Sequence, residues 1–170
     1  YNSHTIFLDE EGFTVLLHDE KKWSEMVMDF HVHKFQKSDS SVKEQSLDFH
    51  SIKYILKGAN LSRHSGTEST PEHYNFFIGN EATNWAEKVK KHTKVVYQDI
   101  YPNIDLEYEA IDERFKYNFI LNKGADIADI RIDIKGAIQT KVTSERIYVK
   151  TRFGEYSEVM PISYEVHNDH

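Results

Sequence analysis

The chain has 170 residues, contains no cysteine and carries a formal net charge of −7. This length suits one domain, and the lack of cysteine excludes a disulfide framework and thiolate metal sites. The acidic balance argues against a nucleic-acid partner, because binding to phosphates needs clustered Lys and Arg. No apolar run approaches the roughly 20 residues needed to span a bilayer, so we expect no membrane span.

The first third of the chain reads mainly as strands. Residues 5–8 and 13–17 flank an acidic turn that ends in Gly12, which predicts an opening hairpin. Apolar residues alternate along residues 26–33, which predicts a third strand. The Ser-rich segment 36–45 predicts a loop, and residues 47–56 return to strand character.

The middle of the chain is more polar. Residues 61–72 are rich in Ser, Thr, Gly and His and predict a second long loop. Residues 83–91 predict one short helix, with Thr83 or Asn84 as its N-cap. The basic cluster of residues 88–94 would then be a solvated helix face.

The second half has the clearest strand pattern. Ile104, Leu106 and Tyr108 share one face of an extended chain, and residues 115–121 repeat the alternation after a polar break, so the two segments predict a hairpin. Ile130, Ile132 and Ile134 alternate with charged residues and predict a half-buried strand. Two further strands are expected at residues 146–151 and 157–166.

These elements predict an all-β fold, an antiparallel β-sandwich of two sheets with one short helix near residues 83–91. An open curved sheet with one small helix is the alternative. We expect a single β domain over residues 1–170.

Several segments together carry a family resemblance. They are residues 75–80 followed by Trp85, residues 97–106, and then, in order, residues 115–119, 123–130, 134–137, 154–155 and 161–165. In these segments the chain resembles the N-terminal domain of large secreted surface proteins of Bacteroidetes-type bacteria. Those proteins often carry SBBP-type β-propeller repeats, PKD modules or a C-terminal sorting signal.

The resemblance implies an exported β domain at the bacterial cell surface, without catalytic residues or cofactors. Three turn positions depart from the family pattern: Asn103 stands where Gly is usual, and Lys123 and Ala128 stand where Pro is usual. The family's opening segment, similar to Asn-Lys-Gly-Gln-Trp, is absent, so we expect the chain to lack a first strand.

The function expected from this resemblance is that of a non-catalytic structural or adhesion module, not an enzyme. Its partners would be other β modules of the same polypeptide or another surface protein. A glycan-binding or glycan-processing β-sandwich is the alternative. A third reading is a component of a secretion or gliding-motility assembly, in which a partner strand completes the sheet.

Candidate contact residues are few. His31 and His33 would share a strand face and could chelate a metal with a third ligand, although exposed strand histidines are ordinary and we expect no metal. Trp85, Tyr74 and Tyr101, with two neighbouring Phe residues, could form a stacking platform for sugar rings, although such aromatics usually belong to a core.

The carboxylates near residue 100 allow two interpretations. Asp99, Asp105, Glu107 and Glu109 could supply the pair of carboxyl groups that glycoside hydrolysis requires. Carboxylates that alternate on a solvated strand face meet that spacing by accident. Asp99 and Asp105 are better explained as turn residues whose side chains accept backbone hydrogen bonds.

Overall fold

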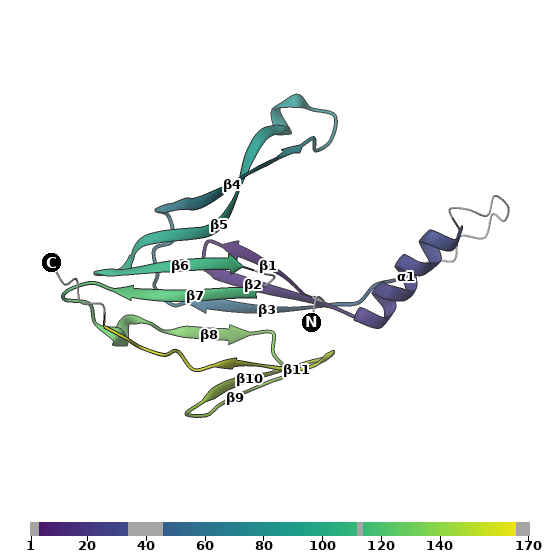
Figure 1. Ribbon diagram of the computed structural model, residues 1–170. Helices are drawn as coiled ribbons and strands as arrows, with labels where there is room; N and C mark the ends of the chain where they lie inside the picture. Colours follow the sequence, from purple (N-terminus) through teal and green to yellow (C-terminus); the bar gives the residue numbers. More distant parts are fainter. Residues whose placement is uncertain (1–3, 34–45, 112–113, 166–170) are drawn as a thin grey trace. The chain divides into compact units, whose positions relative to one another are not determined.

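The computed structural model describes residues 4–33, 46–111 and 114–165, and side chains throughout these ranges except at residues 30–33 (Figure 1). The chain forms two compact units. The terminal unit consists of the described parts of residues 1–9, 13–55 and 133–170, and the central unit consists of residues 10–12 with the described parts of 56–132. The fold is all-β, as predicted, with three antiparallel sheets and one short α-helix.

The terminal unit contains two sheets. The first has the strand order β1-β2-β3-β8 and the second the order β11-β10-β9. Their bounds are β1 (His4–Asp9), β2 (Gly12–His18), β3 (Phe49–Leu56), β8 (Ile132–Lys135), β9 (Gln139–Val142), β10 (Arg146–Thr151) and β11 (Gly154–Val159). The opening hairpin and the strands expected near residues 47–56 and 146–151 are therefore confirmed.

Aromatic side chains fill the terminal unit. The ring of Phe13 stacks on that of Tyr54, with centroids 4.4 Å apart. The Tyr54 hydroxyl lies 2.9 Å from that of Tyr156 and also donates to a carboxylate oxygen of Glu158, so β3 of one sheet contacts β11 of the other. Such burial of large rings supplies much of the core energy of a small β unit.

The central unit is one four-stranded sheet with the order β4-β5-β6-β7. Its strands are β4 (His64–Phe76), β5 (Ala86–Tyr101), β6 (Ile104–Ile111) and β7 (Arg114–Leu121), and it has the short 3₁₀ helices η1 (Ala82–Asn84) and η2 (Ile127–Asp129). The hairpin predicted for residues 104–121 is confirmed, with Tyr108 opposite Tyr117 and Glu109 opposite Lys116. Ile104, Leu106 and Tyr108 are buried, as their alternation predicted.

Helix α1 (Glu20–His33) replaces the strand expected at residues 26–33, so that prediction was wrong. The reason lies at the start of the helix. The Asp19 carboxylate accepts the backbone N–H of Lys22 at 3.1 Å, a side-chain N-cap, and Asp19 O accepts the N–H of Trp23 at 2.9 Å. Glu20 in the first turn adds a carboxylate where the helix dipole favours one.

Two predictions for the middle of the chain were also wrong. Residues 64–72 of the loop predicted over 61–72 belong to strand β4, which runs to Phe76. The helix expected near residues 83–91 is limited to the three residues of η1, after which β5 begins. Thr83 and Asn84, the expected N-cap residues, lie within η1. Glu81, the residue before η1, makes no side-chain cap hydrogen bond. The predicted loop at residues 36–45 lies outside the described residues.

Candidate functional site

Strands β4 and β5 extend well beyond the rest of their sheet and form a projecting two-stranded arm (Figure 1). The last pair that joins β5 to β6 is Lys94 with Glu109, whereas β4 and β5 remain paired as far as Phe76 and Ala86. We call residues 69–92 the arm. Along the arm, β4 and β5 pair with each other, whereas β5 no longer pairs with β6.

The base of the arm is fixed to the sheet by an ion cluster. The Lys94 ammonium lies 3.1 Å from a carboxylate oxygen of Glu68, 3.3 Å from Glu107 and 3.8 Å from Glu109. The hydrogen bond to Glu68 raises the pKa of Lys94, and Glu107 adds to this effect. These contacts join β4, β5 and β6 where the arm begins.

The arm itself is irregular. The register shifts between Ser69 and His73 and again between Tyr74 and Phe76. Lys88 has a positive φ of 56°, and its backbone N–H is bound at 2.8 Å by the side-chain carbonyl of Asn75. A bulge of this kind increases the twist of a strand and keeps its edge from simple pairing.

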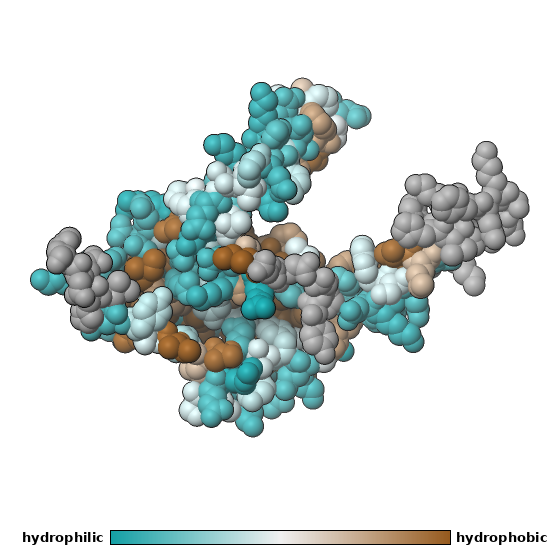
Figure 2. All heavy atoms as spheres, in the orientation of Figure 1, coloured by the Kyte–Doolittle hydropathy of each residue, from teal (hydrophilic) through white to brown (hydrophobic). Residues whose placement is uncertain are grey.

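Exposed apolar side chains surround the outer part of the arm, and we call them the apolar belt. Tyr74 and Val89 are directly opposite each other, so their side chains share a face. The exposed fractions of the belt residues are 50% for Tyr74, 47% for Phe76, 58% for Phe77, 65% for Ile78, 43% for Trp85 and 39% for Val89. Apolar side chains are visible along one side of the arm in Figure 2. No described residue covers them enough to bury them.

Two belt residues are held in place by each other. The rings of Phe77 and Trp85 meet edge to face, with centroids 5.3 Å apart. The Trp85 indole N–H donates to the carbonyl of Gly79 at 3.3 Å, across the turn. The turn itself, residues 79–84, is polar and contains the carboxylate of Glu81. The end of the arm is therefore a polar cap above an apolar belt.

The arm also carries charges along its length. Lys91 pairs with Glu72 at 3.3 Å. Lys88 and Lys90 form part of the lining of a shallow open hollow, together with residues 69–73. No ion pair joins these two ammonium groups to any residue that the structure describes.

The predicted stacking residues separate into two groups. Trp85 and Tyr74 lie on the arm with Phe76 and Phe77, as exposed side chains and not as core. Tyr101 is buried, and its hydroxyl donates to the carbonyl of Lys57 at 3.1 Å, so it is a core residue away from the belt. Burial raises the pKa of Tyr101. The belt residues Ile78 and Val89 had no signal of their own in the sequence.

His31 and His33 belong to α1, so the strand geometry that would have placed them on one face is absent. In a helix, residues two apart point in different directions. Their side chains lie outside the described ones. Among the described residues, no group of three or more His, Asp or Glu side chains could hold a metal ion.

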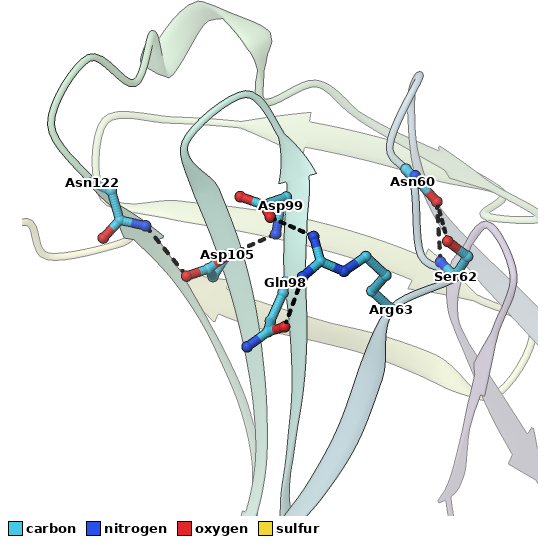
Figure 3. Close-up of polar contacts among 7 residues, drawn as sticks. All are labelled: Asn60, Ser62, Arg63, Gln98, Asp99, Asp105 and Asn122. Atoms are coloured by element: carbon cyan, nitrogen blue, oxygen red, sulfur yellow. Dashed lines mark hydrogen bonds and ion pairs between the residues drawn. The ribbon is translucent and has the colours of Figure 1, made fainter.

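The carboxylates near residue 100 form a structural network at a strand corner (Figure 3). Asp105 accepts the backbone N–H of Asp99 at 2.7 Å and the side-chain amide of Asn122 at 3.2 Å. Asp99 accepts from the Arg63 guanidinium at 2.7 Å, and Gln98 does so at 3.3 Å. Asp105 is thus a turn acceptor, as predicted, whereas the Asp99 side chain forms an ion pair instead.

A second polar group lies inside the terminal unit. Burial raises the pKa of Tyr156 to about 12. The pKa of Tyr54 is raised further, first by burial and then by the adjacent Glu158 carboxylate. Both hydroxyls are protonated at neutral pH and join the two sheets by hydrogen bonds.

Among the described residues, no helix has the length and apolar character needed to cross a membrane. No curated protein and no solved structure matches the chain. One protein-family profile does match, over residues 1–170, and its description is Domain of unknown function (DUF7948). Because this match covers the whole sequence, the chain belongs to the DUF7948 family.

Proposed function

We propose that this chain is a non-catalytic contact module of an exported bacterial cell-surface protein, which acts in adhesion or assembly through the β4–β5 arm. The observation that carries the proposal is the apolar belt on a projecting hairpin. Belt residues such as Phe77 and Ile78 are 58% and 65% exposed. Contiguous apolar side chains of this kind mark interaction sites on soluble domains.

The composition of the belt supports a contact with a macromolecule. Tyr, Trp and Phe are enriched at the cores of protein interfaces, and a few such side chains usually carry most of the binding energy. Here four of the six belt residues are aromatic. The resemblance to domains of secreted surface proteins supports the cellular location.

The test compares two exposed tryptophans. Beads coated with the chain are mixed with intact cells of the source bacterium, and the bound cells are counted. Trp85→Ala should lower cell binding several-fold, because truncation of an aromatic interface anchor commonly costs about 2 kcal/mol or more. Trp23→Ala, at a tryptophan of α1 that is 48% exposed, should leave binding unchanged. Equal cell binding by wild type and Trp85→Ala would refute the arm as the contact.

Glycan binding is the second candidate, and the exposure of Trp85 and Tyr74 on one arm favours it. Exposed aromatic rings can stack on sugar faces. A glycan array checks this directly: specific binding that Trp85→Ala abolishes and Asp105→Ala preserves, with both variants folded, would make a carbohydrate the ligand. An array without binding would send the search to protein partners, including a partner strand of a secretion or gliding assembly.

A further inference from the structure

The two faces of the arm differ in chemistry. Tyr74 is opposite Val89, and the next pair along the strands is His73 with Lys90. Successive side chains of a strand point to opposite faces. The first pair therefore gives one face an apolar character, whereas the second pair places an imidazole and an ammonium group on the other. We call the face of His73 and Lys90 the basic face.

A bulge in β4 accompanies a hollow at this point of the arm. Residues 70–72 of β4 lie opposite the single residue 91 of β5, between two regular pairs. Pro71 in this bulge has no N–H to donate to the strand ladder. The hollow has a volume of ≈ 450 Å³, and small-ligand sites commonly have roughly 300–1,000 Å³. Its lining consists of residues 69–73, Lys88 and Lys90.

The lining of the hollow carries an excess of positive charge. Lys88 and Lys90 contribute two ammonium groups, and no ion pair joins either of them to a described residue. The one carboxylate of the lining, that of Glu72, lies 3.3 Å from the ammonium group of Lys91. Glu87 precedes Lys88 in the chain but does not line the hollow. The hollow therefore suits an anionic group.

A hydroxyl of the same lining supplies an unused donor. The side-chain oxygen of Thr70 is buried and makes no hydrogen bond with any described residue. A buried hydroxyl that is left unpaired costs about 1–3 kcal/mol. An anionic oxygen seated in the hollow would give this hydroxyl an acceptor.

Two aromatic rings continue the basic face toward the turn. Alternation along the chain places Phe77 on the same side as His73. The rings of Phe77 and Trp85 meet edge to face, and these residues are 58% and 43% exposed. Four residues of extended chain separate Phe77 from His73, about 13 Å at roughly 3.3 Å per residue. A ligand that contacts both the rings and the hollow is therefore longer than one sugar.

We propose that the basic face binds an anionic polysaccharide, with a carboxylate or sulfate substituent in the hollow and a neighbouring sugar ring on Phe77 and Trp85. This inference rests on the proposed function, since it names the class of ligand that the same arm binds. The exposed rings favour a saccharide over an acidic peptide, because they can stack on sugar faces. Two unpaired lysines on a chain of net charge −7 are too few for a nucleic-acid backbone.

The first part of the test is isothermal titration calorimetry of the whole chain with soluble polymers at physiological ionic strength. Dextran sulfate and polygalacturonate supply the sulfate and the carboxylate, and dextran is the uncharged match for the first. The chain should bind at least one of the two anionic polysaccharides and should not bind dextran. Binding to neither, or equal binding to dextran, would overturn the proposal. Tighter binding to polyglutamate would make the ligand an acidic peptide and would also overturn it.

The second part compares two double variants that remove the same charge. Lys88→Gln/Lys90→Gln should weaken binding of the anionic polysaccharide at least about tenfold. Lys21→Gln/Lys141→Gln, at exposed positions of α1 and β9, should bind as wild type does. Equal losses in the two variants would show that overall charge governs binding and would overturn the basic face as the site.

The third part uses Thr70→Val, which changes no charge and so separates a built site from diffuse attraction. Loss of a buried hydroxyl without a partner should leave the thermal midpoint unchanged or raise it. Binding of the anionic polysaccharide should nevertheless weaken several-fold. Binding as tight as that of wild type would overturn the hollow as the seat of the anionic group.

The two proposals fail in different ways. Cell binding that depends on Trp85, without binding to either anionic polysaccharide, overturns the ligand class and leaves the contact module in place. Polysaccharide binding that depends on Lys88 and Lys90, with equal cell binding by wild type and Trp85→Ala, overturns the adhesion role and supports the saccharide site.

Discussion

The imidazole of His92 lies over the backbone of Gly66 at the base of the arm, so closely that a Cβ on Gly66 would be 2.6 Å from the ring Cγ. The His92 ring nitrogen Nδ1 is also 3.3 Å from the carbonyl of Thr67. The His92 side chain of β5 can therefore pack directly on the backbone of β4, because Gly66 has no side chain.

Gly66→Ala should therefore lower the free energy of unfolding by about 1 kcal/mol, because the His92 ring must move away. In a His92→Ala background the same change should be neutral or should stabilise slightly, because alanine restricts the unfolded chain more than glycine does. Urea unfolding of the four proteins measures the coupling. Equal effects of Gly66→Ala in both backgrounds would show that the ring does not occupy that position.

A second glycine is required in the terminal unit. Gly136 has a positive φ of 87°, and a Cβ there would lie 2.3 Å from the backbone carbonyl oxygen of Ser51, which cannot rotate away. Gly136→Ala should destabilise by about 3 kcal/mol or more, as overpacking against fixed atoms and a strained φ add up.

Gly58 is the matched control for Gly136. It also has a positive φ, 74°, but a Cβ there meets nothing within 4 Å. Gly58→Ala should cost only about 1 kcal/mol from the backbone conformation. Thermal unfolding compares the two variants, and equal losses would contradict the close approach of Gly136 to Ser51.

The corner at Asp105 gives a third prediction. Its carboxylate accepts the N–H of Asp99, a residue with a positive φ of 50°. Asp105→Ala should cost about 1–2 kcal/mol because that N–H loses its partner. Asp105→Asn retains a carbonyl acceptor and should cost less than half as much in chemical denaturation. A loss with Asn as large as that with Ala would mean that the charge, not the acceptor, holds the corner.

Stability should fall at alkaline pH. The pKa of Tyr156 is raised from 10.0 to about 12 in the folded chain, mainly by burial, and that of Tyr54 is raised in the same direction. The unfolded chain therefore loses these protons first. The stabilisation is complete below pH 10, and for Tyr156 it is lost as the pH rises through about 12.

Urea unfolding at a series of pH values above about 9 measures this loss. The double variant Tyr54→Phe/Tyr156→Phe should show a shallower decrease than wild type, since two of the groups that titrate differently on unfolding are gone. An unchanged slope in the double variant would contradict the burial of these hydroxyls as its cause.

Much of the fold could be predicted because burial leaves a period-2 pattern. Ile104, Leu106 and Tyr108 alternate with charged residues, and all three are buried. The turn after Tyr101 also follows its sequence. Asn103 stands where the resembling family has Gly, and it adopts a positive φ of 61°, a conformation that Asn tolerates better than most residues.

The arm could not be predicted in this way. Neither face of residues 69–76 is buried, so the strand needs no alternation and resembles a loop in composition. Val89 lies four residues after Trp85, a helical spacing, but the Asn75 side chain binds the Lys88 N–H in a bulged strand instead. The sequence offered Trp85 and Tyr74 as a possible platform but favoured a core role for such aromatic residues, and their exposed position on a hairpin required the strand pairing.

The helix α1 shows the converse problem. Residues 26–33 alternate as a strand would, whereas the signals that decide the helix lie earlier, at Asp19 and Glu20. A short alternation of apolar residues, here over eight residues, is also compatible with one apolar face of a helix when neighbouring positions are apolar as well. The candidate pair His31 and His33 rested on the strand interpretation.

The most direct test of the account follows Trp85 itself. The chain has two tryptophans, so Trp23→Phe leaves Trp85 as the single reporter on the apolar belt. When the chain binds to intact cells, the fluorescence of the bound chain, after subtraction of the signal of the cells alone, should lie at shorter wavelength and be quenched less by iodide than that of the free chain, because the bound surface covers the indole. Emission and quenching that are equal for the free and the cell-bound chain would contradict the apolar belt as the contact.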